Sequence, residues 1–291
     1  MQNNKIMGYL AALTSIVIWG TTFIITKGLL GAFRPVEIIL IRMVIALSAL
    51  TLISPRPLRG TTRGQELLFA AAGFSGLVLY FLLENTALTY SMASNVGVII
   101  SAAPFFTAVL NKLFYRSDPL RVQFFIGFVA AMTGIGLISW NGVQLKMNPL
   151  GDFLALCAAA NWGLYSVMMK RISGFGFPTL QVTQRIFLYG VLFMALAAAL
   201  LDFGPLSLLT QPKYLLPLLY LGLGASALCF FTWNFAVLAL GPVRTSVSAY
   251  LVPVVTVASS ALFLREPVTP LAMTGILLIL SGLAISEWHR S

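Results

Sequence analysis

Long apolar stretches separated by short polar breaks recur along the whole chain. A helix needs about 20 mostly apolar residues to cross the hydrocarbon core of a bilayer. Ten stretches come close to that length: 7–26, 36–53, 67–89, 95–114, 121–140, 151–170, 179–201, 214–238, 243–263 and 269–287. Each is continuously apolar, whereas the strands of a membrane barrel alternate strictly over about ten residues. The pattern predicts an all-α integral membrane protein with ten transmembrane helices.

The second half of the chain repeats the first. At a shift of 143 residues, Trp19-Gly20 falls on Trp162-Gly163 and Arg42 falls on Arg185. The same shift superposes Lys27 on Lys170, Gly31 on Gly174 and Pro35 on Pro178. At a shift of 149 residues, Asn85 falls on Asn234 and Pro104 on Pro253, and at a shift of 148, Gly127 falls on Gly275 and Gly134 on Gly282. A repeat of this kind determines the architecture.

The repeat predicts two units of five helices each, residues 1–145 and 146–291. Because five is an odd number, the second unit must enter the membrane upside down relative to the first. Inverted repeats of this kind are typical of secondary transporters, whose substrate site lies near the midplane between the repeats. A duplicated membrane scaffold without a transport role is the alternative.

Composition and charge agree with a protein in lipid. The chain is 59% hydrophobic and 9% charged, where soluble domains carry about 25% charged residues. With the N-terminus inside, eleven of the 18 Lys and Arg residues fall on the cytoplasmic side, five on the other side and two within spans. Since a cytoplasmic excess of basic residues sets orientation, both termini are expected in the cytoplasm. Basic loops facing anionic lipid explain the net charge of +10 without a nucleic-acid partner.

Prolines lie near the middle of the fourth and ninth predicted helices, at Pro104 and Pro253. A proline inside a helix removes one backbone hydrogen bond and clashes with the carbonyl four residues earlier. A carbonyl freed in this way inside lipid needs a partner from protein or from water in a cavity. The matched prolines therefore indicate a central site, although a kink that serves only packing is the alternative.

Aromatic and polar side chains at matching depths are candidates for binding the solute. The candidates are Trp19, Tyr80, Glu84, Asn85, Ser101, Asn161, Trp162, Tyr165, Trp233, Asn234 and Tyr250. Tryptophans at a membrane interface lie at helix ends, but Trp19 and Trp162 lie in mid-helix, each followed by a glycine that lets a ligand or a neighbouring backbone approach. Close helix packing at these glycines is the alternative interpretation.

Two arginines lie inside predicted spans, Arg42 in the second helix and Arg185 in the seventh. Ionisable groups within a membrane are functional hypotheses by default. Either they line two vestibules, where they gate the path or attract a carboxylate, or they extend to the interface and bind helix-end carbonyls as structural clamps. Both interpretations remain open.

Features of enzymes and of metal or cofactor sites are scarce. The only histidine, His289, is in the tail, and acidic residues are nearly absent from the spans. We therefore expect no enzyme activity, no metal and no cofactor. No P-loop sequence for ATP occurs, so transport would be secondary or facilitated, and Glu84 is the one plausible carboxylate for proton coupling. A passive channel remains an alternative that the sequence does not distinguish from a carrier.

The twice-repeated block WG…K…P…R, the ten spans and the proline in the fourth and ninth helices resemble the drug/metabolite transporter superfamily, with the EamA-type branch the most similar. The resemblance covers essentially the whole chain. It implies a cavity built by helices 1–4 and 6–9, peripheral helices 5 and 10, alternating access, and export of amino acids or similar zwitterionic or carboxylate solutes from a bacterial inner membrane. Transport of sugars or of phosphorylated or nucleotide-sugar metabolites is the alternative. A small-molecule substrate and the lipid bilayer are the expected partners, for a monomer or weak homodimer.

Overall fold

The structure is a computed structural model that describes residues 2–91, 93–115, 122–139, 148–198, 206–263 and 268–287. Within these residues every regular element is a helix, and the helices form ten spans. In chain order these are α1 (Gln2–Leu29), α2 (Pro35–Ile53), α3–η1–α4 (Arg63–Gly73, Phe74–Leu79, Tyr80–Tyr90), α5–α6 (Ala93–Ile100, Ala103–Tyr115), α7 (Val122–Ser139), α8 (Pro149–Ser173), α9 (Thr179–Ala198), α10–η3–α11 (Pro212–Leu219, Tyr220–Leu228, Cys229–Leu240), α12–α13 (Pro242–Ser248, Leu251–Phe263) and α14 (Pro270–Glu287), with a 3₁₀ turn η2 (Leu206–Thr210) before α10. The prediction of an all-α protein with ten helical spans is confirmed.

Length and apolarity suit a membrane. In the described part of the chain, six helices are long and apolar enough to cross one: Asn4–Leu29, Pro35–Ile53, Arg63–Tyr90, Val96–Tyr115, Thr179–Ala198 and Pro212–Leu240. Two shorter apolar helices, Val122–Ile138 and Pro270–Ser286, are only slightly below that length. Six of the ten predicted spans thus meet both criteria within the described residues.

The helix starts follow from local sequence. Proline at the first helical position has no amide hydrogen to satisfy and a φ already suited to a helix, and Pro35, Pro149 and Pro242 begin α2, α8 and α12. The Asn148 side chain accepts a hydrogen bond from the Gly151 amide at 3.1 Å, which caps α8. Gly241, between α11 and α12, adopts a φ of 84°, a conformation that glycine reaches without steric cost.

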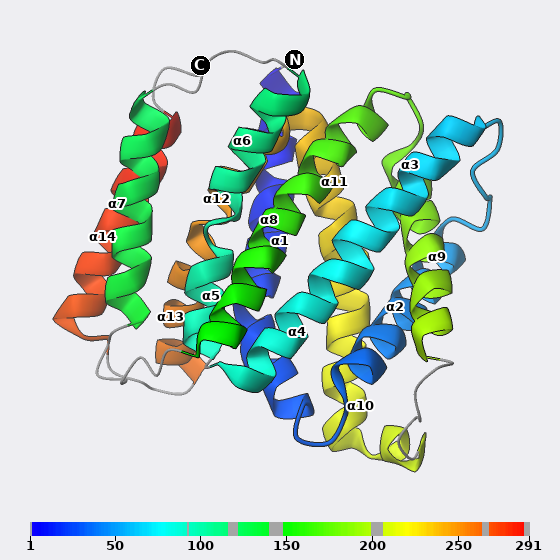
Figure 1. Cartoon of the computed structure of the whole chain (residues 1–291), viewed down its shortest axis with the longest axis horizontal. Helices are drawn as coiled ribbons and strands as arrows, with labels where there is room; N and C mark the ends of the chain where they lie inside the picture. Colours follow the sequence, from blue (N-terminus) through cyan, green and yellow to red (C-terminus); the bar gives the residue numbers. More distant parts are fainter. Residues whose placement is uncertain are drawn as a thin grey trace.

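The helices alternate in direction, and α1 begins on the same face of the molecule on which α14 ends (Figure 1). Packing between them is reciprocal. Helix α1 packs against α11 and α13, and its repeat counterpart α8 packs against the counterparts of those two, α4 and α6. Helices α7 and α14 lie side by side at one edge (Figure 1), as the peripheral position of helices 5 and 10 requires.

Glycine contacts between α7 and α14 show how the two repeats are related. A Cβ added at Gly127 would collide with the Gly282 carbonyl, and one added at Gly134 with the Gly275 carbonyl. The two helices are antiparallel, because the earlier glycine of one contacts the later glycine of the other. Since Gly127 corresponds to Gly275 and Gly134 to Gly282, each contact is the two-fold image of the other, as a dyad demands. The pair α7 and α14 therefore has the symmetry that two inverted repeats predict. The predicted boundary after residue 145 lies outside the described residues.

Two irregularities occur at matching places in the repeats. The fourth and ninth spans are interrupted, at Ser101-Ala102 and at Ala249-Tyr250, just before Pro104 and Pro253. The third and eighth spans contain the π-helical segments η1 and η3. Such segments are rare and occur frequently at functional sites. The sequence predicted kinked continuous helices; the structure instead has broken spans, because tight turns such as the Ala102 amide to the Ile99 carbonyl, at 3.0 Å, replace the helical bonds before the proline.

Candidate functional site

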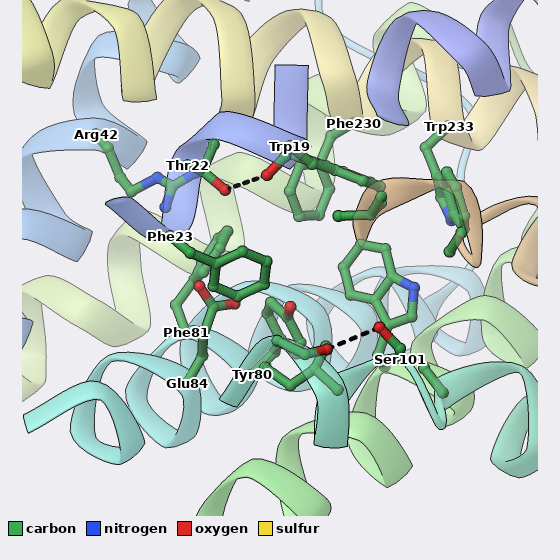
Figure 2. Close-up of a pocket in the computed structure, with 16 residues that line it drawn as sticks. Trp19, Thr22, Phe23, Arg42, Tyr80, Phe81, Glu84, Ser101, Phe230 and Trp233 are labelled. Atoms are coloured by element: carbon green, nitrogen blue, oxygen red, sulfur yellow. Dashed lines mark hydrogen bonds between the residues drawn. The ribbon is translucent and has the colours of Figure 1, made fainter. Parts of the chain in front are cut away.

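A cavity of about 70 Å³ lies between the repeats, with room for roughly five water-sized groups. Its walls come from both halves of the chain (Figure 2). The lining residues are Trp19, Thr22, Phe23, Arg42, Tyr80, Phe81, Glu84, Gly97, Ile100, Ser101, Ala103, Trp162, Phe230, Trp233, Ala249 and Val252. Thr22 and Phe23 lie in the second half of α1, and Arg42 lies in the first half of α2. The cavity is therefore displaced from the centre toward the face opposite the chain ends.

Three tryptophans and Phe230 form the apolar wall of the cavity. The Trp19 ring centroid lies 5.3 Å from that of Trp162 in an edge-to-face arrangement, and 5.0 Å from that of Trp233. The Phe230 centroid is 5.7 Å from that of Trp162. The Trp19 indole donates a hydrogen bond to the Ala225 carbonyl at 3.0 Å, which fixes the ring. These separations suit aromatic pairs, and the ring faces could bind an apolar group or a cation.

One cationic and one acidic side chain face this aromatic cavity. Arg42 on α2 is 2% exposed; its Nε donates to Ser226 Oγ at 2.8 Å, and its guanidinium lies 4.1 Å from the centre of the Phe81 ring. Within the described structure, its two terminal nitrogens have no hydrogen-bond partner. Glu84 on α4 is 4% exposed and lies one helical turn after Tyr80. Figure 2 shows Arg42 and Glu84 reaching toward the cavity from two different helices, so a solute there would meet both charges.

Arg185, the repeat counterpart of Arg42, lies away from this cavity. Its Nη2 donates to the Leu58 carbonyl at 2.8 Å and is 3.4 Å from the Glu66 carboxylate. The Tyr189 hydroxyl donates to the same carboxylate at 2.6 Å. Arg185 thus joins α9 to the segment between α2 and α3, beside a separate cavity of about 150 Å³. In this conformation the geometry of Arg185 matches a clamp, whereas that of Arg42 matches a vestibule position.

The broken spans lie at the cavity, but their prolines do not line it. Ile100, Ser101 and Ala103 surround the first break, and Ala249 and Val252 flank the second. The Ser101 hydroxyl donates to the Gly97 carbonyl at 2.7 Å (Figure 2). The lining therefore includes irregular backbone, which membrane proteins tolerate beside a cavity. Pro104 and Pro253 each follow the break in their span, so they affect the cavity through the broken turns rather than by lining it.

Five predicted binding residues lie outside the cavity: Asn85, Asn161, Tyr165, Asn234 and Tyr250. Three of them, Asn161, Tyr165 and Asn234, make hydrogen bonds to neighbouring helices. The Asn161 amide donates to the Ser75 carbonyl at 2.6 Å and its Oδ1 accepts from Ser75 Oγ at 2.8 Å. The Tyr165 hydroxyl donates to Asn234 Oδ1 at 2.8 Å, and Asn234 Nδ2 donates to Thr183 Oγ1 at 3.0 Å.

The glycines after the two mid-helix tryptophans allow close helix packing. A Cβ added at Gly20 would lie 2.9 Å from Val255 Cγ1, and one added at Gly163 would lie 2.8 Å from the Thr107 amide nitrogen. These contacts bring α1 against α13 and α8 against α6. The packing interpretation accounts for the glycines, while the adjacent indoles reach the cavity.

A family model describes both halves of this arrangement. The model of the EamA-like transporter family matches residues 6–140 and 149–288. The chain belongs to the EamA-like transporter family. The resemblance seen in the repeated sequence block is confirmed.

Several proteins are similar to this EamA-like transporter over nearly their whole lengths. A protein of Escherichia coli (strain K12) named "Probable amino-acid metabolite efflux pump" is 28% identical over 295 residues, covering 96% of each chain. A "Probable terminal-alkyne amino-acid exporter" of Streptantibioticus cattleyicolor is 25% identical over 278 residues, covering 94% of this chain and 91% of that one. A solved crystal structure aligns with a TM-score of 0.74 at 19% identity over 96% of both chains, which supports the fold. The family and these names indicate a multi-pass membrane transporter of metabolites rather than an enzyme.

The sequence alone did not single out several lining residues of this EamA-like transporter. Thr22, Phe23, Phe81 and Phe230 were missed. Helical spacing was the available signal, because Thr22 and Phe23 follow Trp19 by three and four residues, and Phe230 precedes Trp233 by three. The lining residues at the two breaks, such as Ile100, Ala103 and Ala249, had no comparable signal in the sequence. Whether they reach the cavity depends on how far each span is opened at its break.

Proposed function

We propose that this EamA-like transporter is a secondary carrier that exports zwitterionic amino acids or closely similar solutes by alternating access. The observation that carries the proposal is the placement of Arg42 and Glu84 on different helices around an otherwise aromatic cavity. A guanidinium binds carboxylates in two-point geometry, and a carboxylate with nearby ring faces binds an ammonium group.

The bound solute would be oriented by these two charges. Its carboxylate would contact the terminal nitrogens of Arg42, and its ammonium group would lie at Glu84. Its side chain would then lie against Trp19, Trp162 and Phe230. One cation in the cavity favours a carboxylate over a phosphorylated solute, for which a cluster of basic groups would be expected.

Orientation and energy source complete the proposal. With both chain ends in the cytoplasm of a bacterial inner membrane, the aromatic cavity belongs to the outward half of the protein. Rocking of the two inverted repeats about the midplane would open each half in turn. Glu84 is the group in the described cavity that could carry a coupled proton.

Counterflow into proteoliposomes tests the function. Vesicles preloaded with an unlabelled solute are supplied with the radiolabelled form of leucine, phenylalanine, their amides, their deaminated acids or a sugar phosphate. We expect saturable, trans-stimulated uptake of the free amino acids, with much weaker uptake of amides and deaminated acids. Flux without saturation or trans-stimulation would identify a passive channel instead, and preference for the sugar phosphate would contradict the assignment of substrate class.

A further inference from the structure

Five buried polar groups in the second repeat have no hydrogen-bond partner among the described residues. One of them, Ser286 Oγ, lies on α14; the other four are Ser166 Oγ, Arg185 Nε, Trp233 Nε1 and the Tyr250 hydroxyl. A buried polar group without a partner costs about 1–3 kcal/mol, so several in one region need an explanation. Ser166, Trp233 and Tyr250 each have 0% exposure, which leaves no direct contact with solvent in this conformation.

Each of these other four residues, unlike Ser286, is the repeat counterpart of a residue that lines the cavity. Ser166 corresponds to Phe23, Arg185 to Arg42, Trp233 to Glu84 and Tyr250 to Ser101. The unpartnered groups therefore occupy, in the second repeat, the positions that surround the open space in the first. Trp233 also contributes to the existing cavity, so it belongs to both sets.

Hydrogen bonds join the helices on the side of the molecule that these residues face, although a separate cavity lies beside Arg185. The hydrogen-bonded chain from Tyr165 through Asn234 to Thr183 ties α8, α11 and α9 together. On the open side, Asn85 corresponds to Asn234 and has no hydrogen-bond partner in the described structure. The first repeat has Thr22 and Leu40 where the second has Tyr165 and Thr183, so this polar chain is a feature of the second repeat alone.

Inverted repeats can exchange such arrangements, so that each repeat adopts the conformation now held by the other. In that second conformation the counterparts of the cavity residues would surround an open space on the side of the chain ends. The four groups would then gain partners from solvent or solute, which explains why polar side chains occupy positions that are now buried and unpaired.

We infer that Ser166, Arg185, Trp233 and Tyr250 form a second half-site, which binds the carboxylate end of the solute when the protein opens toward the face of its chain ends. The inference rests on the proposed alternating access. Arg and Trp side chains only donate hydrogen bonds, and Ser and Tyr hydroxyls can donate them, so the half-site suits an anionic acceptor. Trp233 stands where the first repeat has Glu84, and the half-site therefore lacks a counterpart for the ammonium group.

Sided labelling of introduced cysteines tests the half-site. Cys157 and Cys229 are first replaced by Ala, and Ser166→Cys and its matched control Ser101→Cys are made in that background. Each variant is treated with a membrane-impermeant maleimide in right-side-out and in inside-out vesicles. We expect the Ser166→Cys variant to react only from the face of the chain ends, the Ser101→Cys variant only from the opposite face, and a transported amino acid to slow both reactions several-fold.

Two results would overturn the inference. One is reaction of both variants from the same face, and the other is an unreactive Ser166→Cys variant that still transports at the rate of its background. Should that variant fail to fold, Ser246→Cys on α12, the counterpart of the lining residue Gly97, provides the same test. Sidedness requires no knowledge of the solute. Correct sidedness without transport of any amino acid would refute the proposed function alone, whereas transport with incorrect sidedness would refute the half-site alone.

Discussion

Replacing Arg42 with Gln removes the only cation in the described wall of the cavity. The Gln amide can still donate a hydrogen bond toward Ser226, but the guanidinium contact with Phe81 at 4.1 Å and the two-point contact with a carboxylate are lost. A hydrogen bond to a charged group contributes about 1.5–3 kcal/mol. Since each 1.4 kcal/mol corresponds to a factor of about ten in affinity, the KM for a free amino acid should rise by roughly 10- to 100-fold.

The amide of the same amino acid separates solute binding from structural support. An amide lacks the anionic group that Arg42 would contact, so its own weak uptake should change little in the Arg42→Gln variant. The assay is counterflow in proteoliposomes with the acid and the amide in parallel, and Lys213→Gln, a charge removal at the exposed start of α10, is the control. Equal loss of acid and amide uptake would mean that Arg42 acts only as a clamp, and the proposed pose would be abandoned.

Three further changes probe other parts of the structure. Glu84→Gln should reduce preference for amino acids over their deaminated acids by about tenfold or more and abolish acceleration by a pH gradient; transport that keeps both properties would exclude Glu84 from ammonium binding and proton coupling. Gly134→Ala should destabilise the α7–α14 contact by about 1–3 kcal/mol through overpacking, which would lower the Tm. Gly136→Ala is the control and should leave the Tm unchanged, because the space around its Cβ position is open. Equal Tm values for the two variants would contradict the packing of α7 against α14. Tyr165→Phe removes the hydrogen bond to Asn234, which is worth about 1 kcal/mol. Added to the Ser166→Cys variant, it should increase the rate of maleimide reaction from the face of the chain ends about fivefold. An unchanged rate would show that this hydrogen bond does not restrict access from that face.

The architecture could be predicted because it depends on signals that are local and repeated. Apolar length and the matched pairs Trp19/Trp162 and Pro104/Pro253 predicted ten spans in two related halves. The π-helical segments could not be foreseen in this way, since no residue type marks them and only packing of the surrounding helices selects them.

The candidate site was harder to predict, because the sequence is nearly symmetric and the conformation is not. Arg42 and Arg185 occupy equivalent positions in the two repeats. Arg42 lines the cavity, whereas Arg185 binds Leu58 and Glu66. Asn85 and Asn234 differ in the same manner, one unpartnered and the other bonded to Tyr165. Neither asparagine lines the cavity; for the arginine pair, which member does so depends on the conformation of its repeat.

The glycine contacts between α7 and α14 restrict how the two halves can move. Backbone carbonyls lie close to the glycines there, together with the side chains of Ser286, Ile138 and Ile279, so little room is left for one helix to slide along the other. This edge can therefore serve as a fulcrum, about which rotation is easier than translation. Displacement in a rotation grows with distance from its axis, so the largest excursions should occur at the far edge, around α2, α3 and α9 (Figure 1).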